Sequence, residues 1–212
     1  MLSGRNLKEN LINNGFFINN NEINIIDDYN ICDITEEATE FFLDNFNDTG
    51  CRNINIYYAI PSYREDTRAF IHNLAHSLNI DFNVALAIYS LSKINKRQFN
   101  PHAIAAKLAK AGRFISSFHE IGIRVSLKPY YSINLRPPFH GRYWLTGARG
   151  FIVDASLNTY GKGKIFAQLM DDENFSIITR FFNDEILNNR RNDRLPIIDA
   201  EILNGFANML EN

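Results

Sequence analysis

The sequence predicts an α/β protein of the α+β sandwich type, in which helices flank a mixed β-sheet. The chain has 212 residues, of which 45% are hydrophobic and 22% charged, values typical of one globular domain with a small appendage. Patterns typical of strands and helices alternate after residue 52. Two apolar runs over residues 142–156, separated by a glycine-containing turn, indicate a pair of adjacent strands.

Residues 1–50 are predicted to form a small N-terminal appendage of helix, hairpin and helix. Residues 7–13 suit a short helix. Residues 16–26 contain two apolar stretches around three asparagines, which tolerate left-handed turn geometry and favour a hairpin. Residues 33–46 have a capping residue (Asp33 or Thr35), acids in the next turn and three phenylalanines, so we expect a helix.

Strands and helices alternate in the first part of the main domain, which spans residues 51–212. Residues 53–60 are predicted to be a strand and residues 64–78 an amphipathic helix. Residues 82–91 are apolar enough for a buried strand, although their alanines also allow a helix. Residues 101–121 begin with a proline suited to the first helical position. A strand is expected over residues 122–129.

The C-terminal part is predicted to begin with paired strands and to end in helices. Residues 142–147 and 150–156 are the paired strands, with the segment from Gly147 to Gly150 as their turn. Residues 164–191 have a helical pattern that is broken near Asp171. Residues 195–212 suit a last amphipathic helix.

Charge, cysteine content and hydropathy exclude several classes of protein. The formal net charge is −2, so a site for nucleic acid has to be a local basic patch and not a global positive field. Two cysteines are too few for a disulfide framework or a metal cluster. The N-terminal segment lacks the apolar stretch of a signal peptide, and no run approaches the roughly 18 apolar residues of a membrane span. We therefore expect a cytoplasmic protein without a transmembrane segment.

Polar residues mark the ends of the two paired strands. His140 and Arg142 stand at the start of the first strand, and Ser156 and Asn158 follow the second. This arrangement resembles one half of the phospholipase D superfamily, whose motif is His-x-Lys, an aspartate and then Gly-Ser-x-Asn. The resemblance covers about residues 52–185. It implies a phospholipase D-like mixed sheet flanked by helices.

The chain departs from the family pattern at three positions. Arg142 stands at the lysine position and Gly147 at the aspartate position. Ala155 stands at the position of the glycine that precedes the serine. The spacing between His140 and Ser156 is also one residue longer. Such His-x-Arg versions are similar to the phospholipase D-like domains that end some microtubule-trafficking proteins, which act as binders of membrane surfaces or partners.

The resemblance implies a phosphodiesterase, specifically a nuclease, that needs no metal or cofactor. His140 would attack phosphorus and form a phospho-histidine, while Arg142, Ser156 and Asn158 would hold the non-bridging oxygens. Arginine keeps the positive charge of the family's lysine and adds a fork that matches a phosphate. Further ligand contacts are expected from four residues: Tyr143, Asp154, Lys162 and Lys164. Asp154 could partly replace the aspartate that is absent at position 147.

A single motif per chain implies a homodimer, because a complete site of this family needs two such motifs. His102 and His119 are not followed by a matching Ser-x-Asn segment. The two-fold axis of a dimer would then bring two equivalent histidines together. DNA, RNA, nucleotides and phospholipids all offer the required diester, so nucleic acid and the surface of a membrane both remain as partners.

The same residues are also compatible with a protein that has no catalytic activity. The chain could be an inactive phospholipase D-like module that binds a phosphate-bearing ligand or a protein partner. His140 could be a surface residue, and Ser156 and Asn158 could end a strand and cap a helix. His72 and His76 have a spacing that can bind zinc, but no further ligand is nearby in the sequence. The basic clusters at 93–97 and 190–194 suit either a solvated surface or a nucleic-acid contact.

Overall fold

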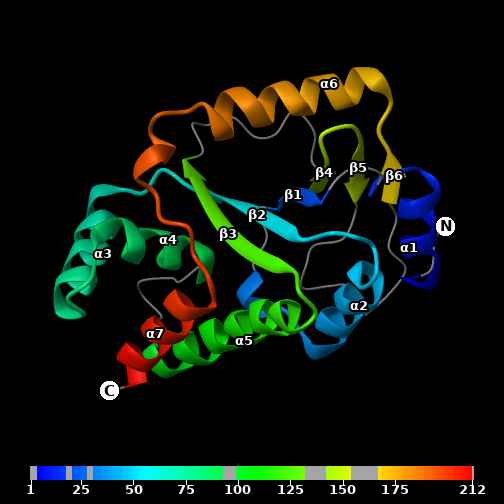
Figure 1. Ribbon diagram of the computed structural model, residues 1–212. Coiled ribbons are helices and arrows are strands. Elements are labelled where there is room, and N and C mark those ends of the chain that lie inside the picture. The colour runs from blue at the N-terminus through cyan, green and yellow to red at the C-terminus, as the bar shows by residue number, and fades with distance from the viewer. Residues whose placement is uncertain are drawn as a thin grey trace.

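The fold is a six-stranded mixed β-sheet with helices on both faces (Figure 1). The computed structural model of the chain describes residues 4–17, 21–27, 31–92, 99–131, 142–153 and 167–211. The strand order is β3-β2-β1-β4-β5-β6. The strands are β1 (Glu22–Ile26), β2 (Asn53–Ile60), β3 (Arg124–Tyr131), β4 (Arg142–Leu145), β5 (Gly150–Val153) and β6 (Ala167–Leu169).

The sheet has a parallel half and an antiparallel half. Strands β1, β2 and β3 run parallel, whereas β4, β5 and β6 each run antiparallel to their neighbours. Strand β1 lies at the junction, with β2 on one side and β4 on the other. The prediction of a mixed sheet flanked by helices is confirmed.

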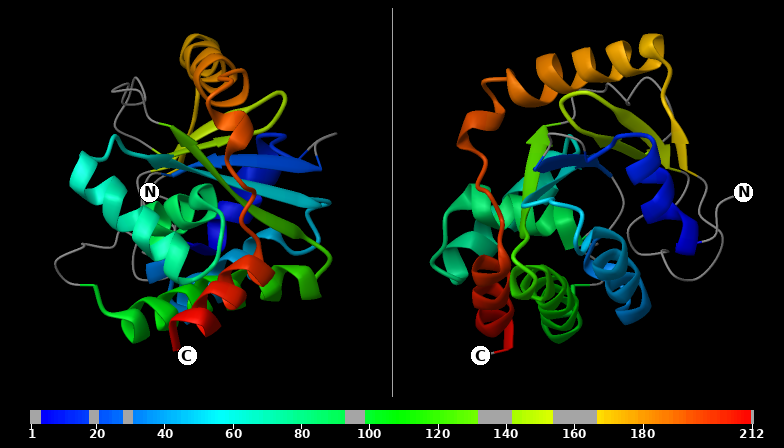
Figure 2. Two further views of the ribbon diagram at one scale, coloured as in Figure 1. Left: turned by 90° about the vertical axis from the view of Figure 1, so that its left-hand side faces the viewer. Right: turned by 45° about the vertical axis from the view of Figure 1, so that its right-hand side comes forward.

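The helices are divided unequally between the two faces of the sheet. Figure 2 shows α5 and α7 side by side on one face, with α2 next to α5, and α6 on the other face. The described helices are α1 (Gly4–Asn13), α2 (Glu36–Phe46), α3 (Glu65–Ser77), α4 (Phe82–Ser92), α5 (Pro101–Glu120), α6 (Asp172–Phe181) and α7 (Ala200–Glu211), with short 3-10 turns at Ile31–Asp33 and Asn192–Arg194 and a π-helical segment at Phe182–Leu187.

Alternating side chains of the strands supply two separate hydrophobic clusters. Trp144 of β4 belongs to the larger cluster, where its ring lies 5.8 Å from that of Phe42 in α2. Tyr143, the next residue, belongs to a smaller cluster that includes Ile178 and Phe182 from α6 and the π-helical segment. Because neighbouring residues of a strand point to opposite faces, this alternation is what a sheet covered on both sides requires.

Residues 1–50 share the sheet and the core of the remaining chain. Strand β1 pairs with both β2 and β4, so the second half of the predicted hairpin uses both its edges for other strands. Phe16, which follows α1, lies against Phe151 of β5 with ring centroids 5.2 Å apart. The described part of this segment therefore shares the sheet and the core of the chain that follows residue 50.

One element that the sequence left open between strand and helix is a helix, and one predicted helix differs from the structure. Residues 82–91 form helix α4, which Asp81 caps by accepting a hydrogen bond from the backbone N–H of Asn83 at 2.7 Å. Nearly all sides of this buried helix carry apolar residues. Its hydrophobic pattern in the sequence is therefore the same as that of a buried strand. The helical pattern predicted from residue 164 instead contains β6, and α6 begins after its cap Asp171.

Two features surround Gly150, the first residue of β5: a hydrogen-bonded turn before it and close packing against residues near the start of α6. Thr146 closes the turn: its backbone N–H donates to the carbonyl of Arg149 at 2.9 Å, and its hydroxyl accepts from the N–H of Arg149 at 3.1 Å. A Cβ added at Gly150 would lie 2.8 Å from the sulfur of Met170 and 2.9 Å from the ring of Phe175. Close packing of β5 against the start of α6 thus leaves no room for a larger residue.

Replacing Gly150 by alanine should therefore destabilise the fold. We expect Gly150→Ala to lower the free energy of unfolding by about 1–3 kcal/mol, the usual cost of overpacking a core. The matched control is Gly205→Ala in α7, where an added Cβ meets nothing within 4 Å. That variant should gain about 0.5–1 kcal/mol from helix propensity. Urea unfolding measures both changes, and an unchanged or increased stability of Gly150→Ala would contradict the packing described.

Candidate functional site

The candidate site lies where the parallel strands end and the antiparallel hairpin begins. Ile26, the last residue of β1, pairs with Tyr143 of β4, so Asp27 and Arg142 come next on adjacent strands. Arg142 in turn pairs with Val153, the last residue of β5. Three strands thus bring Asp27, Arg142 and Val153 to one edge of the sheet.

Topology makes this edge a natural place for a ligand. The chain leaves β1 to build β2 and β3 on one side, and the later strands β4, β5 and β6 are added on the other side. In open α/β sheets, ligands bind beyond the carboxyl ends of the strands at the point where the strand order reverses. In this sheet, that point is the junction of β1 and β4.

A buried ion pair marks this junction. One carboxylate oxygen of Asp27 (Oδ1) lies 3.8 Å from Nε of Arg142, and the two side chains are 1% and 18% exposed. The backbone N–H of Asp27 also donates to the carbonyl of Tyr57 in β2, at 3.0 Å. Burial of a carboxylate is costly unless a cation and hydrogen bonds compensate it. Asp27 and Arg142 therefore compensate each other's charge at this edge of the sheet, at a distance longer than a hydrogen bond.

The chemistry of a guanidinium suits this position. It carries five N–H donors in a rigid plane. This number is larger than the number of hydrogen bonds that a single carboxylate can accept from it. The same plane matches two oxygens of a phosphate, and the group keeps its charge at all physiological pH values. An arginine fixed by a buried aspartate can therefore present a positioned cation to an anionic ligand.

The structure places two of the predicted site residues, in different surroundings. Arg142 lies at the edge described above. Tyr143 is fully buried in the smaller cluster, beneath α6 and beside Ile26. The expected contact of Tyr143 with a ligand gains no support from this buried position and stays a prediction. His140, Asp154, Ser156, Asn158, Lys162 and Lys164 lie outside the described residues.

Asp27 is a site residue that the sequence analysis missed. The predicted hairpin placed residues 16–26 in a separate unit, where an acid after the second strand has no particular meaning. The available signal was local: an aspartate directly follows the apolar run that ends at Ile26. Its significance depends on β4, a strand more than a hundred residues later in the chain.

Gly147, which stands at the aspartate position of the motif that the sequence resembles, lies far from Arg142. It lies in the turn that joins β4 to β5, next to the pair formed by Leu145 and Gly150. Arg142 and Val153 form the last pair at the opposite end of the same hairpin. The change at position 147 therefore removes no group from the edge that carries Arg142.

Metal and thiol chemistry receive no support from the described residues. In these parts of the chain, no three His, Cys, Asp or Glu residues come together as metal ligands. His72 stacks on the ring of Phe82 with centroids 3.9 Å apart. Burial raises the pKa of the Cys32 thiol to about 12 and that of Cys51 to about 11. Both thiols stay protonated at neutral pH and are poor nucleophiles.

Comparisons with known proteins add no relatives. No protein-family model, no curated protein and no solved structure matches this chain. Within the described residues, no helix has both the length and the apolar character needed to cross a membrane.

Arg142→Ala should destabilise the protein because it removes the cation next to buried Asp27. We expect the free energy of unfolding to fall by about 3 kcal/mol. This value is near the lower end of the usual cost of breaking a buried ion pair, because the side chain of Arg142 is partly exposed. Adding Asp27→Asn to this variant should recover part of the loss, since the amide carries no charge. Urea unfolding of the single and double variants measures the coupling, and strictly additive effects would show that the two groups do not interact.

Proposed function

We propose that this protein hydrolyses phosphodiesters by phospholipase D-type chemistry and that it acts as a metal-independent nuclease. One observation carries the proposal: Arg142 and Val153 are register partners at the end of the β4–β5 hairpin. The two halves of the motif adjoin these residues in the sequence. His140 precedes Arg142 by two positions, and Ser156 follows Val153 by three.

The register matters because the motif works only if its halves converge. A slip of one residue between β4 and β5 would turn Arg142 to the opposite face from Val153. In the observed register, Arg142 and Val153 share the face of Trp144, and both stand at the edge where β1 ends. This geometry supports a shared site for residues that are far apart in the sequence.

The proposed reaction has two displacement steps at phosphorus. In the first, a ring nitrogen of His140 forms a bond to phosphorus as the bond to the leaving oxygen breaks, and a second imidazolium gives that oxygen a proton. In the second, water attacks phosphorus, loses a proton to the second imidazole and displaces His140. Arg142, Ser156 and Asn158 would stabilise the negative charge on the non-bridging oxygens in both steps.

The second imidazole is proposed to come from another copy of the chain. The sequence holds one motif, so the equivalent His140 of a two-fold related copy would act as the general acid. Within each copy, Asp27 is a positioning residue: it fixes the guanidinium of Arg142 at 3.8 Å but does not reach the reacting atoms in this scheme.

A binding module without catalysis is the second candidate. The observation that favours it is the ion pair itself, because Asp27 offsets part of the charge that Arg142 could offer to a transition state. Such a module would bind a phosphate-bearing ligand, such as nucleic acid or an acidic lipid, or a protein partner. It would retain the anion site and lack turnover.

Substitutions at the two motif residues separate these candidates. In the enzyme, His140→Ala should abolish turnover while ligand affinity stays nearly unchanged, because the imidazole acts on the reacting bond. Arg142→Ala should weaken binding about 10- to 150-fold, the equivalent of 1.5–3 kcal/mol for a charged hydrogen bond, and should lower turnover as well. Arg142→Lys should retain activity, because lysine also supplies a cation. The assay is a fluorescent panel of single-stranded DNA, duplex DNA, RNA and phosphatidyl lipid, beside a binding titration.

Two controls make the assay specific. Arg124→Ala, at the start of β3 and at the opposite end of that strand from the carboxyl edge, removes a positive charge without touching the site. Reactions with added EDTA test whether hydrolysis persists without metal, as an imidazole nucleophile requires. If no substrate is cleaved while Arg142→Ala removes binding of at least one, the protein is a binding module and not an enzyme.

A further inference from the structure

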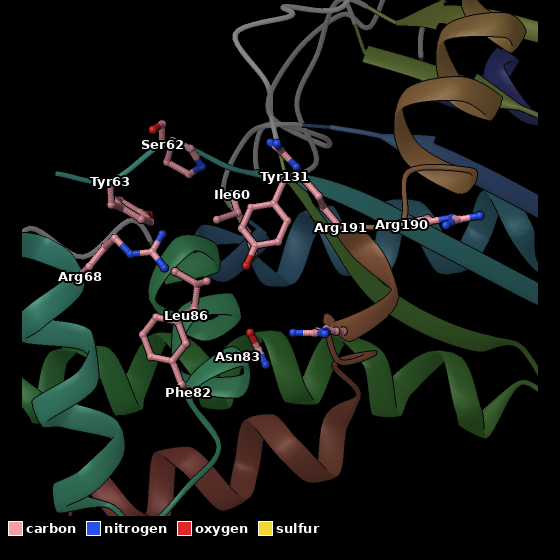
Figure 3. Close-up of a pocket in the computed structure, with 12 residues that line it drawn as sticks. Ile60, Ser62, Tyr63, Arg68, Phe82, Asn83, Leu86, Tyr131, Arg190 and Arg191 are labelled. Atoms are coloured by element: carbon pink, nitrogen blue, oxygen red, sulfur yellow. The ribbon is translucent and has the colours of Figure 1, made fainter. Parts of the chain in front are cut away.

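A pocket lies beyond the ends of β2 and β3 and is separate from the edge at Arg142. Its volume is about 680 Å³. Figure 3 shows residues from five parts of the chain around it: the end of β2, helix α3, helix α4, the end of β3, and the segment that follows the π-helix. The described residues that line it are Ile60, Pro61, Ser62, Tyr63, Arg68, Phe82, Asn83, Leu86, Tyr131, Arg190, Arg191 and Arg194.

The lining is strongly positive although the whole chain has a net charge of −2. Among the described lining residues, four are arginines and none is an aspartate or glutamate. In the part of the chain that the structure describes, no carboxylate lies within 4.0 Å of any of these four guanidinium groups. The basic cluster at 190–194, for which the sequence favoured a solvated patch over a nucleic-acid contact, thus forms one wall of a concave site.

Aromatic side chains form the rest of the wall together with Leu86. In Figure 3, the ring of Tyr131 lies between Arg68 on one side and Arg191 on the other, with Phe82 below. Phe82 is held by His72, whose ring stacks on it at 3.9 Å, and Arg68 lies 5.9 Å from the same ring. The pocket therefore combines flat apolar surfaces with cations at its rim.

Hydrogen bonds fix the arginine-bearing segment to the sheet. The amide oxygen of Asn192 accepts from the backbone N–H of Tyr131 at 2.9 Å, and its NH₂ group donates to the carbonyl of Ile186, also at 2.9 Å. A few residues later, Ile198 and Leu127 exchange two backbone hydrogen bonds of 2.9 Å. These bonds fix the backbone of the segment that carries Arg190, Arg191 and Arg194, whose side chains are exposed, so the segment itself needs little ordering when a ligand binds.

The opposite wall is equally constrained. The hydroxyl of Tyr63 donates to the hydroxyl of Ser90 in α4 at 3.1 Å, and its ring packs edge-on against Tyr89 with centroids 5.4 Å apart. Burial raises the pKa of Tyr63 to about 12, so its hydroxyl stays neutral and adds no negative charge to the pocket.

We infer that this pocket binds a nucleotide unit, with its base against the aromatic walls and its phosphates at the arginines. A volume of about 680 Å³ falls within the range of ordinary small-ligand sites. Bases stack on aromatic rings without regard to sequence, and guanidinium groups bind phosphate oxygens in pairs. A free nucleotide and the end of a single strand of nucleic acid present the same chemistry, and the test separates these two sources.

This inference does not depend on the proposed catalysis. The pocket adjoins the last pair of β2 and β3, Ile60 with Tyr131, whereas Arg142 belongs to β4 on the other side of β1. Strands lie about 4.8 Å apart, so roughly 10–15 Å separate the two places along the same edge. A nucleotide in the pocket would be a neighbour of the Arg142 site and not its occupant.

The test is a fluorescence titration of the full chain with a fluorescent adenosine diphosphate at low salt. Binding should weaken about tenfold in Arg68→Ala and in Arg191→Ala, the loss of one charged hydrogen bond, and should stay unchanged in Arg124→Ala. Phe82→Leu keeps apolar packing but removes the ring, so it should weaken nucleotide binding as well. Circular dichroism checks that each variant is folded. Displacement by oligothymidylate identifies a strand end as the ligand, and failure of displacement identifies the free nucleotide.

Three results would overturn the inference. The first is that the intact protein binds neither the nucleotide nor the oligomer. The second is that inorganic tripolyphosphate, which has no base, competes as well as the nucleotide. The third is that binding is lost in Arg142→Ala but kept in Arg191→Ala, which would assign the nucleotide to the Arg142 site. Because Arg142→Ala is measured in parallel, failure of this pocket and failure of the proposed enzyme are distinguished.

Discussion

Strand β1 forms backbone hydrogen bonds with two neighbouring strands that run in opposite directions, and the rest of the fold depends on this pairing. It pairs parallel with β2 over its whole length and antiparallel with β4 over its last residues. Both backbone edges are therefore used, and an early segment becomes the centre of the sheet. The same pairing joins the parallel half to the hairpin of β4 and β5, so neither half exists as a separate unit.

This junction also places a buried ion pair next to strands whose side chains are largely apolar. Side chains of β1 before Asp27 are buried on both faces, in the larger cluster through Ile25 and in the smaller through Ile26. An aspartate at the end of such a strand is stable only with a cation nearby, and the antiparallel neighbour supplies Arg142. The electrostatic requirement of the fold thus fixes the residue on which the proposed chemistry relies.

The sequence was informative wherever the signal is local. Local patterns predicted α2, α5 and the β4–β5 pair: Thr35, one of the two expected caps, caps α2, and Pro101 begins α5. It failed where the answer depends on distant partners. The neighbours of β1 decide that it is central, and complete burial hides the helical period of α4. The pocket at Arg191 arises from five segments that no local pattern connects. Six of the eight predicted site residues lie outside the described residues, so those assignments stay predictions.

The central claim is that the edge at Arg142 supports attack on phosphorus by His140, and trapping the covalent intermediate tests it most directly. The protein would be mixed with bis(4-nitrophenyl) phosphate, quenched in denaturant and digested for mass spectrometry. The account predicts a 4-nitrophenyl phosphate adduct on the peptide that contains His140, stable in alkali, lost in acid and absent from His140→Ala. Release of nitrophenol by the intact protein without any adduct on that peptide, or with an adduct that persists in His140→Ala, would contradict it.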